Sequence, residues 1–222
     1  KLGGRNMMNN TKKPLNLKRV TILTSIIILL PIFYGLAVYH ELPAQIAIHW
    51  GVNNQPNGWA SRPMAVFGIP VLMMLIQWFM LGTYAINART KGRTYRMEVV
   101  TFSIMPILTI VLYVTTLAIA MGMKLNVGKI ATLVIGVMFV AMGNYLPTVT
   151  YEQQVGSRHY PKPSSAQNWA VASRSIGYTM FFGGLLMLIS LLFPMLVSAI
   201  VVAVIIILLV LFSIRGAMRH DN

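Results

Sequence analysis

The feature that most constrains this chain is a series of long apolar runs without charged side chains. Residues 20–39 carry no charge over twenty positions, and residues 175–214 carry none over forty. A helix rises 1.5 Å per residue, so about 20 apolar residues cross the ~30 Å of hydrocarbon in a bilayer. We therefore predict an all-α fold, that of a polytopic integral membrane protein.

The composition supports this fold class. Of the 222 residues, 56% are hydrophobic and 10% are charged, whereas about 25% of residues are charged in a soluble domain. The net charge of +14 does not indicate a nucleic-acid partner, because the Lys and Arg residues lie in short segments beside apolar runs and form no basic run interleaved with aromatics. The chain has no cysteine, which excludes disulfides, a thiol nucleophile and cysteine-based metal sites.

We predict six transmembrane helices, at residues 20–39, 65–86, 99–121, 130–146, 175–193 and 196–214. Pro31 removes a backbone hydrogen bond inside the first span and should kink it. Pro194 leaves room only for a tight turn between the last two spans, which should form an antiparallel pair.

The distribution of Lys and Arg predicts the orientation of the chain. Counted from Lys12 onward, alternate loops carry thirteen of these residues on one side and three on the other, Arg62, Lys124 and Lys129. Because cytoplasmic loops are enriched in Lys and Arg, we expect both termini to be cytoplasmic. Loop 40–64 is then extracytoplasmic and loop 147–174 cytoplasmic.

This topology divides the chain into a cytoplasmic N-terminal tail (1–19), a first helical pair with its outer loop (20–86), a four-helix region (87–214) and a cytoplasmic tail (215–222). The first apolar run is too long for a cleavable signal peptide. Codons for Leu2-Gly3-Gly4 can spell a bacterial ribosome-binding sequence before Met7 and Met8. We therefore interpret residues 1–6 as translated leader and expect the native start at one of these two methionines.

The polar segment 40–62 carries a donor set that could hold zinc, His40, Glu41 and His49. The two histidines are nine residues apart with Pro43 between them, so they do not share a helical face, and they are weak candidates for a metal site. We expect His40 and Glu41 to be solvated where the first span leaves the bilayer. His49 has apolar neighbours and is expected to be buried and hydrogen-bonded.

Two tryptophans in the same segment, Trp50 and Trp59, allow two interpretations. Indole rings commonly anchor proteins at the headgroup level of a membrane. Alternatively, the two rings line a docking surface for a hydrophobic peptide, with hydrogen bonds from Asn53, Asn54 and Asn57. The run Pro56-Asn57-Gly58 is a turn signal.

On the opposite side of the membrane, Asn144 lies near the end of the fourth span and is expected to pack inward. Ser164 or Ser165 should cap a short amphipathic stretch that carries Trp169 and continues into the fifth span. None of the four acidic residues lies well inside a predicted span, which argues against a proton-coupled transporter. No catalytic or phosphate-binding motif is present, so we expect no enzyme activity and no cofactor.

Two stretches resemble known bacterial membrane proteins. Leu42-Pro43-x-x-Ile46-x-Ile48-His49-Trp50, followed by Pro56-Asn57-Gly58-Trp59-x-Ser61-Arg62, resembles a membrane domain of unknown function that commonly precedes the SdpI-like segment. Gly143-Asn144-Tyr145-Leu146-Pro147, then Gly156-Ser157-Arg158 and Trp169, resembles a signature of the SdpI family. The two stretches occur in the expected order and cover most of residues 40–190.

The resemblance implies a bacterial plasma-membrane protein with six helices, which protects its host from a secreted antimicrobial peptide or toxin and has a signalling role through a cytoplasmic regulator. Its expected partners are membrane lipid, the toxin and that regulator. The residues expected to face the toxin are His49, Trp50, Asn57, Gly58, Trp59 and Arg62. The cytoplasmic signature comprises Gly143, Asn144, Pro147, Gly156, Arg158 and Trp169.

The alternatives are a membrane metalloenzyme and a small-molecule transporter subunit. The metalloenzyme would use His40, Glu41 and His49, or His159 with Glu152. In the transporter, Gly136, Gly143, Gly183 and Gly184 would permit close helix packing or motion.

Overall fold

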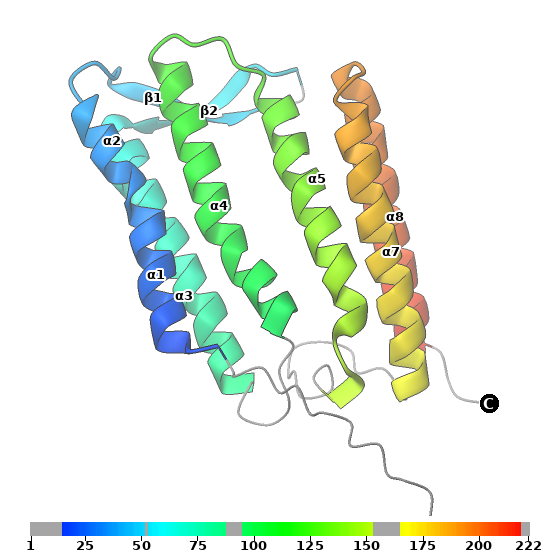
Figure 1. Ribbon diagram of the computed structural model, residues 1–222. Coiled ribbons are helices and arrows are strands. Elements are labelled where there is room, and N and C mark those ends of the chain that lie inside the picture. Colours follow the sequence, from blue (N-terminus) through cyan, green and yellow to red (C-terminus); the bar gives the residue numbers. More distant parts are fainter. Residues whose placement is uncertain (1–14, 52, 88–94, 153–164, 219–222) are drawn as a thin grey trace, which may run out of the picture.

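Six helices that are long and apolar enough to cross a membrane stand side by side (Figure 1). The computed structural model describes residues 15–51, 53–87, 95–152 and 165–218. In this part of the chain the spans are Leu17–Ala37, Met64–Ile86, Arg96–Ala120, Val127–Thr148, Ala166–Ser190 and Met195–Arg215. The predicted all-α, multi-pass membrane fold is confirmed.

Proline interrupts the first span at the position predicted from the sequence. Helix α1 (Leu17–Leu29) begins at Asn16, whose side chain accepts a hydrogen bond from the backbone N–H of Arg19. The helix ends before Pro31, and α2 (Pro31–Ala37) continues the span. A proline has no N–H to donate to the preceding turn, so the predicted kink at Pro31 is confirmed.

The remaining helices follow the predicted order, and the largest difference in boundary is at the fifth span. A π-helix, η1 (Met64–Gly68), leads into α3 (Ile69–Asn87), and α4 (Tyr95–Ala120) precedes α5 (Val127–Tyr145) with its 3₁₀ extension η2 (Leu146–Thr148). Helix α7 (Ala166–Ser190) begins nine residues before the predicted fifth span, because Ser165 caps it by accepting from the N–H of Asn168 at 3.2 Å. The stretch around Trp169 therefore belongs to the same continuous helix. Helix α8 (Met195–Met218) follows after the tight turn predicted at Pro194.

The helices form two groups. One contains α1 to α4, and the other contains α5, α7 and α8; α5 packs much less closely against α4 than against α7 (Figure 1). The second group depends on glycines at the crossing of α5 and α7. A Cβ at Gly143 would collide with the backbone N of Phe181 and lie 2.6 Å from the carbonyl oxygen of Gly177.

The same packing recurs further along this crossing. A Cβ at Gly184 would lie 2.6 Å from the carbonyl oxygen of Gly136. In lipid, helices associate through close backbone approach rather than through the hydrophobic effect. These glycines therefore hold α5 against α7. This is the close helix packing that the sequence suggests for Gly136, Gly143 and Gly184.

Segment 40–62 contains two strands that the sequence did not lead us to expect. β1 (Gln45–Trp50) pairs with β2 (Pro56–Ser61) in an antiparallel hairpin at one end of the helices (Figure 1). Its inner side packs in a fully buried cluster whose members come from β1 and the residues just before it, from η1 and from α4, namely Leu42, Ile46, Ala65, Val66, Tyr113 and Leu117. This packing fixes the hairpin to the first helix group. Within the cluster, the Tyr113 hydroxyl donates a hydrogen bond of 3.2 Å to the carbonyl of Val66, which joins α4 to η1.

We predict that Gly143→Ala destabilises the protein by roughly 1–3 kcal/mol, because the new methyl group meets backbone atoms that cannot rotate away. The matched control is Gly82→Ala in α3, where a Cβ would meet no atom within 4 Å. That change should be neutral or stabilising, by up to about 1 kcal/mol, through helix propensity. Thermal unfolding in detergent measures both variants, and equal melting temperatures would disprove close packing at Gly143.

Candidate functional site

The turn of the hairpin lies at residues 51–55 and not at Pro56-Asn57-Gly58. Gly51 N–H donates to the carbonyl of Gln55 (2.9 Å) and Asn54 N–H donates to the carbonyl of Gly51 (3.0 Å). Asn54 has φ +59°, a left-handed conformation that asparagine tolerates better than most residues. The interpretation of 56–58 as the turn is wrong, because Asn54 supplies the positive φ and the Pro-Asn-Gly run forms strand β2.

A bulge in β1 determines how His49 lies. The strand register shifts on both sides of His49, which is paired with Gly58. A Cβ at Gly58 would lie 3.0 Å from the Cβ of His49, so glycine provides the room for this close approach. His49 is exposed, and the expectation that it is buried is wrong.

His49 forms a polar pair across the hairpin. Its Nδ1 lies 2.5 Å from Oδ1 of Asn57. An amide oxygen only accepts hydrogen bonds, so Nδ1–H is the donor, and in the neutral form of this tautomer Nε2 is an acceptor. The amide nitrogen of Asn57 remains on an exposed side chain. The pair therefore offers a donor and an acceptor at the protein surface.

Apolar side chains accompany this pair. Trp59 is 57% exposed, and Ile48 at the bulge is 38% exposed. Trp59 lies opposite Ala47 in the strand register, and a methyl group is too small to cover an indole ring. Trp50 is half-buried near the turn, so the two tryptophans are not equally available to a ligand.

Arg62 holds the base of the hairpin. Its backbone N–H donates to the carbonyl of Ala44 (3.0 Å), and its Nε donates to the carbonyl of Pro43 (3.3 Å). The guanidinium carbon lies 5.3 Å from the centre of the Tyr39 ring, a cation–π distance. These contacts join the end of β2 to the end of the first span.

The geometry gives the metal alternative no support. His40 and Glu41 are exposed, as expected, and His40 packs edge-on against Tyr39. Among the residues that the structure describes, no three His, Cys, Asp or Glu side chains lie close enough together to hold a metal ion. His159 lies outside the described residues.

A side chain in the hairpin turn contacts the second helix group. Oδ1 of Asn54 accepts a hydrogen bond from the backbone N–H of Val127 (2.8 Å), and its Nδ2 donates to the carbonyl of Leu125 (3.4 Å). Val127 is the first residue of α5, and its N–H has no partner within the helix. Asn54 thus links the hairpin to α5, a connection over 73 residues that the sequence pattern did not reveal.

The residues of the cytoplasmic signature have several environments. Gly143 packs on α7. Pro147 packs closely against Gly177, since a Cβ at Gly177 would lie 2.8 Å from the Pro147 ring. Trp169 is buried, and its Nε1 donates to the carbonyl of Val149 at 2.7 Å. Asn144 is exposed, so its expected inward packing is wrong. Gly156 and Arg158 lie outside the described residues.

One acidic residue lies deeper than predicted. Glu98 is only 6% exposed, because the third span begins at Arg96 rather than at 99. The Tyr84 hydroxyl hydrogen-bonds one carboxylate oxygen of Glu98, while the other oxygen has no hydrogen-bond partner. Glu98 nevertheless occupies only the first turn of α4, so it does not lie well inside the span.

Comparison with known proteins places the hairpin in a recognised segment. Residues 26–74 match the model of a family described as Domain of unknown function (DUF1648). Over 137 residues the chain is 27% identical to the protein named "Immunity protein SdpI" of Bacillus subtilis (strain 168). The resemblance to an SdpI-like family is confirmed. No solved structure matches the chain.

The SdpI-like similarity covers 62% of this chain and 64% of the Bacillus subtilis relative, less than two thirds of that protein's length. The residues that match the family of unknown function run from the middle of α1 to the first half of α3. They include both strands of the hairpin, with His49, Asn57 and Trp59.

We predict that Asn54→Gly loosens the start of α5 while keeping the turn. Glycine adopts a positive φ without strain, so the change removes only the side-chain hydrogen bonds, each contributing about 0.5–1.5 kcal/mol. Hydrogen exchange at the Val127 amide should become faster. Asn53→Ala is the control, because Asn53 bonds only the nearby Gln55 N–H. Unchanged exchange at Val127 in Asn54→Gly would contradict the link.

Proposed function

We propose that this chain is an immunity protein of the bacterial plasma membrane that protects its cell from a secreted antimicrobial peptide or toxin. The similarity to a protein named for immunity supports the general role. The observation that supports the site is the hairpin, which presents an exposed indole, an exposed isoleucine and a hydrogen-bonding pair beyond the ends of the helices (Figure 1).

In this proposal the hairpin faces the outside of the cell. Lys18, Arg19, Arg96 and Arg215 lie at helix ends on the opposite side, whereas Arg62, Lys124 and Lys129 lie on the hairpin side. Counted from Lys12 onward over all loops, the ratio is thirteen to three in favour of the opposite side. The positive-inside rule then places both termini in the cytoplasm.

The chemistry of the exposed face suits a membrane-active peptide. Trp59 and Ile48 offer apolar area, and aromatic residues often dominate binding energy at interfaces. His49 and Asn57 offer an acceptor and a donor to peptide backbone or polar side chains. Trp50, Gly58 and Arg62 have supporting roles, since they shape the strand pair and fix its base. Binding alone, without a chemical reaction, would divert or occlude the peptide.

A signalling role through loop 147–174 stays a prediction. In the described part of this loop, Trp169 fastens the end of α5 to α7 through Val149. A regulator would therefore have a rigid helix end on which to dock.

We predict that a strain lacking this gene is killed by a secreted peptide that its parent survives, and that the intact gene restores survival. Trp59→Ala and His49→Ala should each lose protection at unchanged expression, since each removes part of the exposed face. Phe79→Ala, which alters a side chain 72% exposed in the middle of α3, and His40→Ala, at an exposed histidine near the hairpin, are the matched controls. Full protection by both hairpin variants would reject the hairpin as the toxin site.

A second measurement separates peptide binding from membrane anchoring by Trp59. If Trp59 only anchors the hairpin among headgroups, Trp59→Ala should lower the amount of protein in the membrane and His49→Ala should protect fully. Loss of protection in both variants at normal membrane levels favours direct binding.

A further inference from the structure

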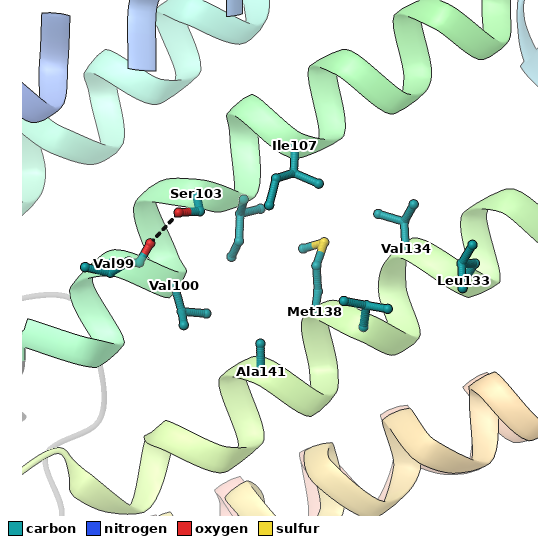
Figure 2. A pocket seen from close by; sticks show the side chains of 10 residues that line it. Val99, Val100, Ser103, Ile107, Leu133, Val134, Met138 and Ala141 are labelled. Carbon is teal, nitrogen blue, oxygen red and sulfur yellow. Dashed lines mark hydrogen bonds between the residues drawn. The ribbon is translucent and has the colours of Figure 1, made fainter. Parts of the chain in front are cut away.

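An apolar groove lies between α4 and α5, on the seam of the two helix groups (Figure 2). Its volume is about 360 Å³, and its walls include Val99, Val100 and Ile107 from α4 and Val137, Met138 and Ala141 from α5. The hydroxyl of Ser103 in the wall donates to the carbonyl of Val99 at 2.7 Å, so its proton is not available to a ligand in the groove. The lining is thus hydrocarbon from both helices.

The groove exists because α5 is held elsewhere. Glycines bring α5 against α7, and Asn54 holds the start of α5 under the hairpin. Helix α4 is fixed to the first group, where Glu98 meets Tyr84 and Tyr113 meets Val66. The facing sides of α4 and α5 therefore stay partly uncovered, with Ile107 50% exposed and Val137 52% exposed.

The size of the groove decides between two apolar occupants. Three turns of helix, roughly 10 Å wide and 16 Å long, fill on the order of 1,200 Å³. A helix of a partner protein is thus too large to enter this groove and could only pack across its opening. A single acyl chain is narrow and flexible enough to enter, and acyl chains surround a membrane protein on all sides.

Polar residues stand at one mouth of the groove. Arg96 is three and four residues before Val99 and Val100, which places it on the same stripe of α4. Asn144 and Tyr145 are three and four residues after Ala141 and extend the stripe of α5. Arg96 and Asn144 are exposed. Glu98, the acidic residue near this mouth, is buried and bonds Tyr84 through one carboxylate oxygen, while the other has no hydrogen-bond partner, so no hydrogen bond joins it to Arg96.

We propose that the groove binds one anionic phospholipid, with an acyl chain between α4 and α5 and the phosphate headgroup at Arg96 and Asn144. The guanidinium supplies the charge and the donors that suit a phosphate. Asn144, exposed at the same end of the groove, supplies a second donor. This mouth lies at the end of the helices where the Lys and Arg residues gather, which matches an anionic leaflet.

The test is native mass spectrometry of the full-length protein, purified in detergent and offered equal amounts of phosphatidylglycerol and phosphatidylcholine. The wild type should retain one phosphatidylglycerol preferentially. Arg96→Gln should reduce that preference about fivefold, the effect expected for one cation near an anionic surface. Lys129→Gln, an exposed cation at the opposite end of α5, should leave the preference unchanged.

Filling the groove tests the site of the acyl chain. Ala141→Trp should abolish retention of either lipid, and Val137→Trp should do the same if Ala141→Trp does not fold. Ala203→Trp on the exposed face of α8 is the matched control and should bind lipid normally. Wild-type retention in a folded groove variant, or an unchanged preference in Arg96→Gln, would overturn the proposal. If a groove variant still retains the lipid but no longer protects cells from the toxin, the groove binds a peptide instead. This result would also overturn the proposal.

Discussion

The lack of water in the bilayer is the constraint on which this structure depends. Every backbone N–H and C=O in hydrocarbon needs an internal partner, so only helices and closed barrels cross. The six spans satisfy this requirement within themselves. A two-stranded hairpin has two open edges and cannot do so, and accordingly β1 and β2 lie at the ends of the helices (Figure 1). The constraint that makes the spans helical thus also keeps the strands out of the hydrocarbon, at the ends of the helices, where a ligand in water can reach them.

A hairpin of two strands is barely stable alone, so the helices must hold it. Ile46 and its neighbours bury the inner side against η1 and α4, Arg62 fixes the base on Tyr39, and Asn54 fixes the turn on α5. These three attachments reach both helix groups. The apolar groove lies between the same two groups.

The sequence predicts the spans well because their cause is local. Apolar length, Pro31, Pro194 and the cap at Ser165 each act within a few residues. The strands were missed because β1 has only a short apolar alternation at Ile46 and Ile48, and because Asn57-Gly58 imitates a turn. The true turn depends on Asn54, whose partner Val127 is distant in the chain. Likewise, the exposure of His49 follows from a bulge, and Glu98 was misplaced by a boundary error of three residues.

Access to the hairpin from outside the cell is the central claim of this account, and the absence of cysteine from the chain allows a direct measurement. Ser61→Cys on β2 and Gln167→Cys at the start of α7 introduce single thiols at exposed positions. A membrane-impermeant maleimide should label Ser61→Cys in intact cells, and Gln167→Cys only after the membrane is opened. Labelling of Gln167→Cys but not Ser61→Cys in intact cells would place the hairpin in the cytoplasm and contradict binding of a secreted peptide there.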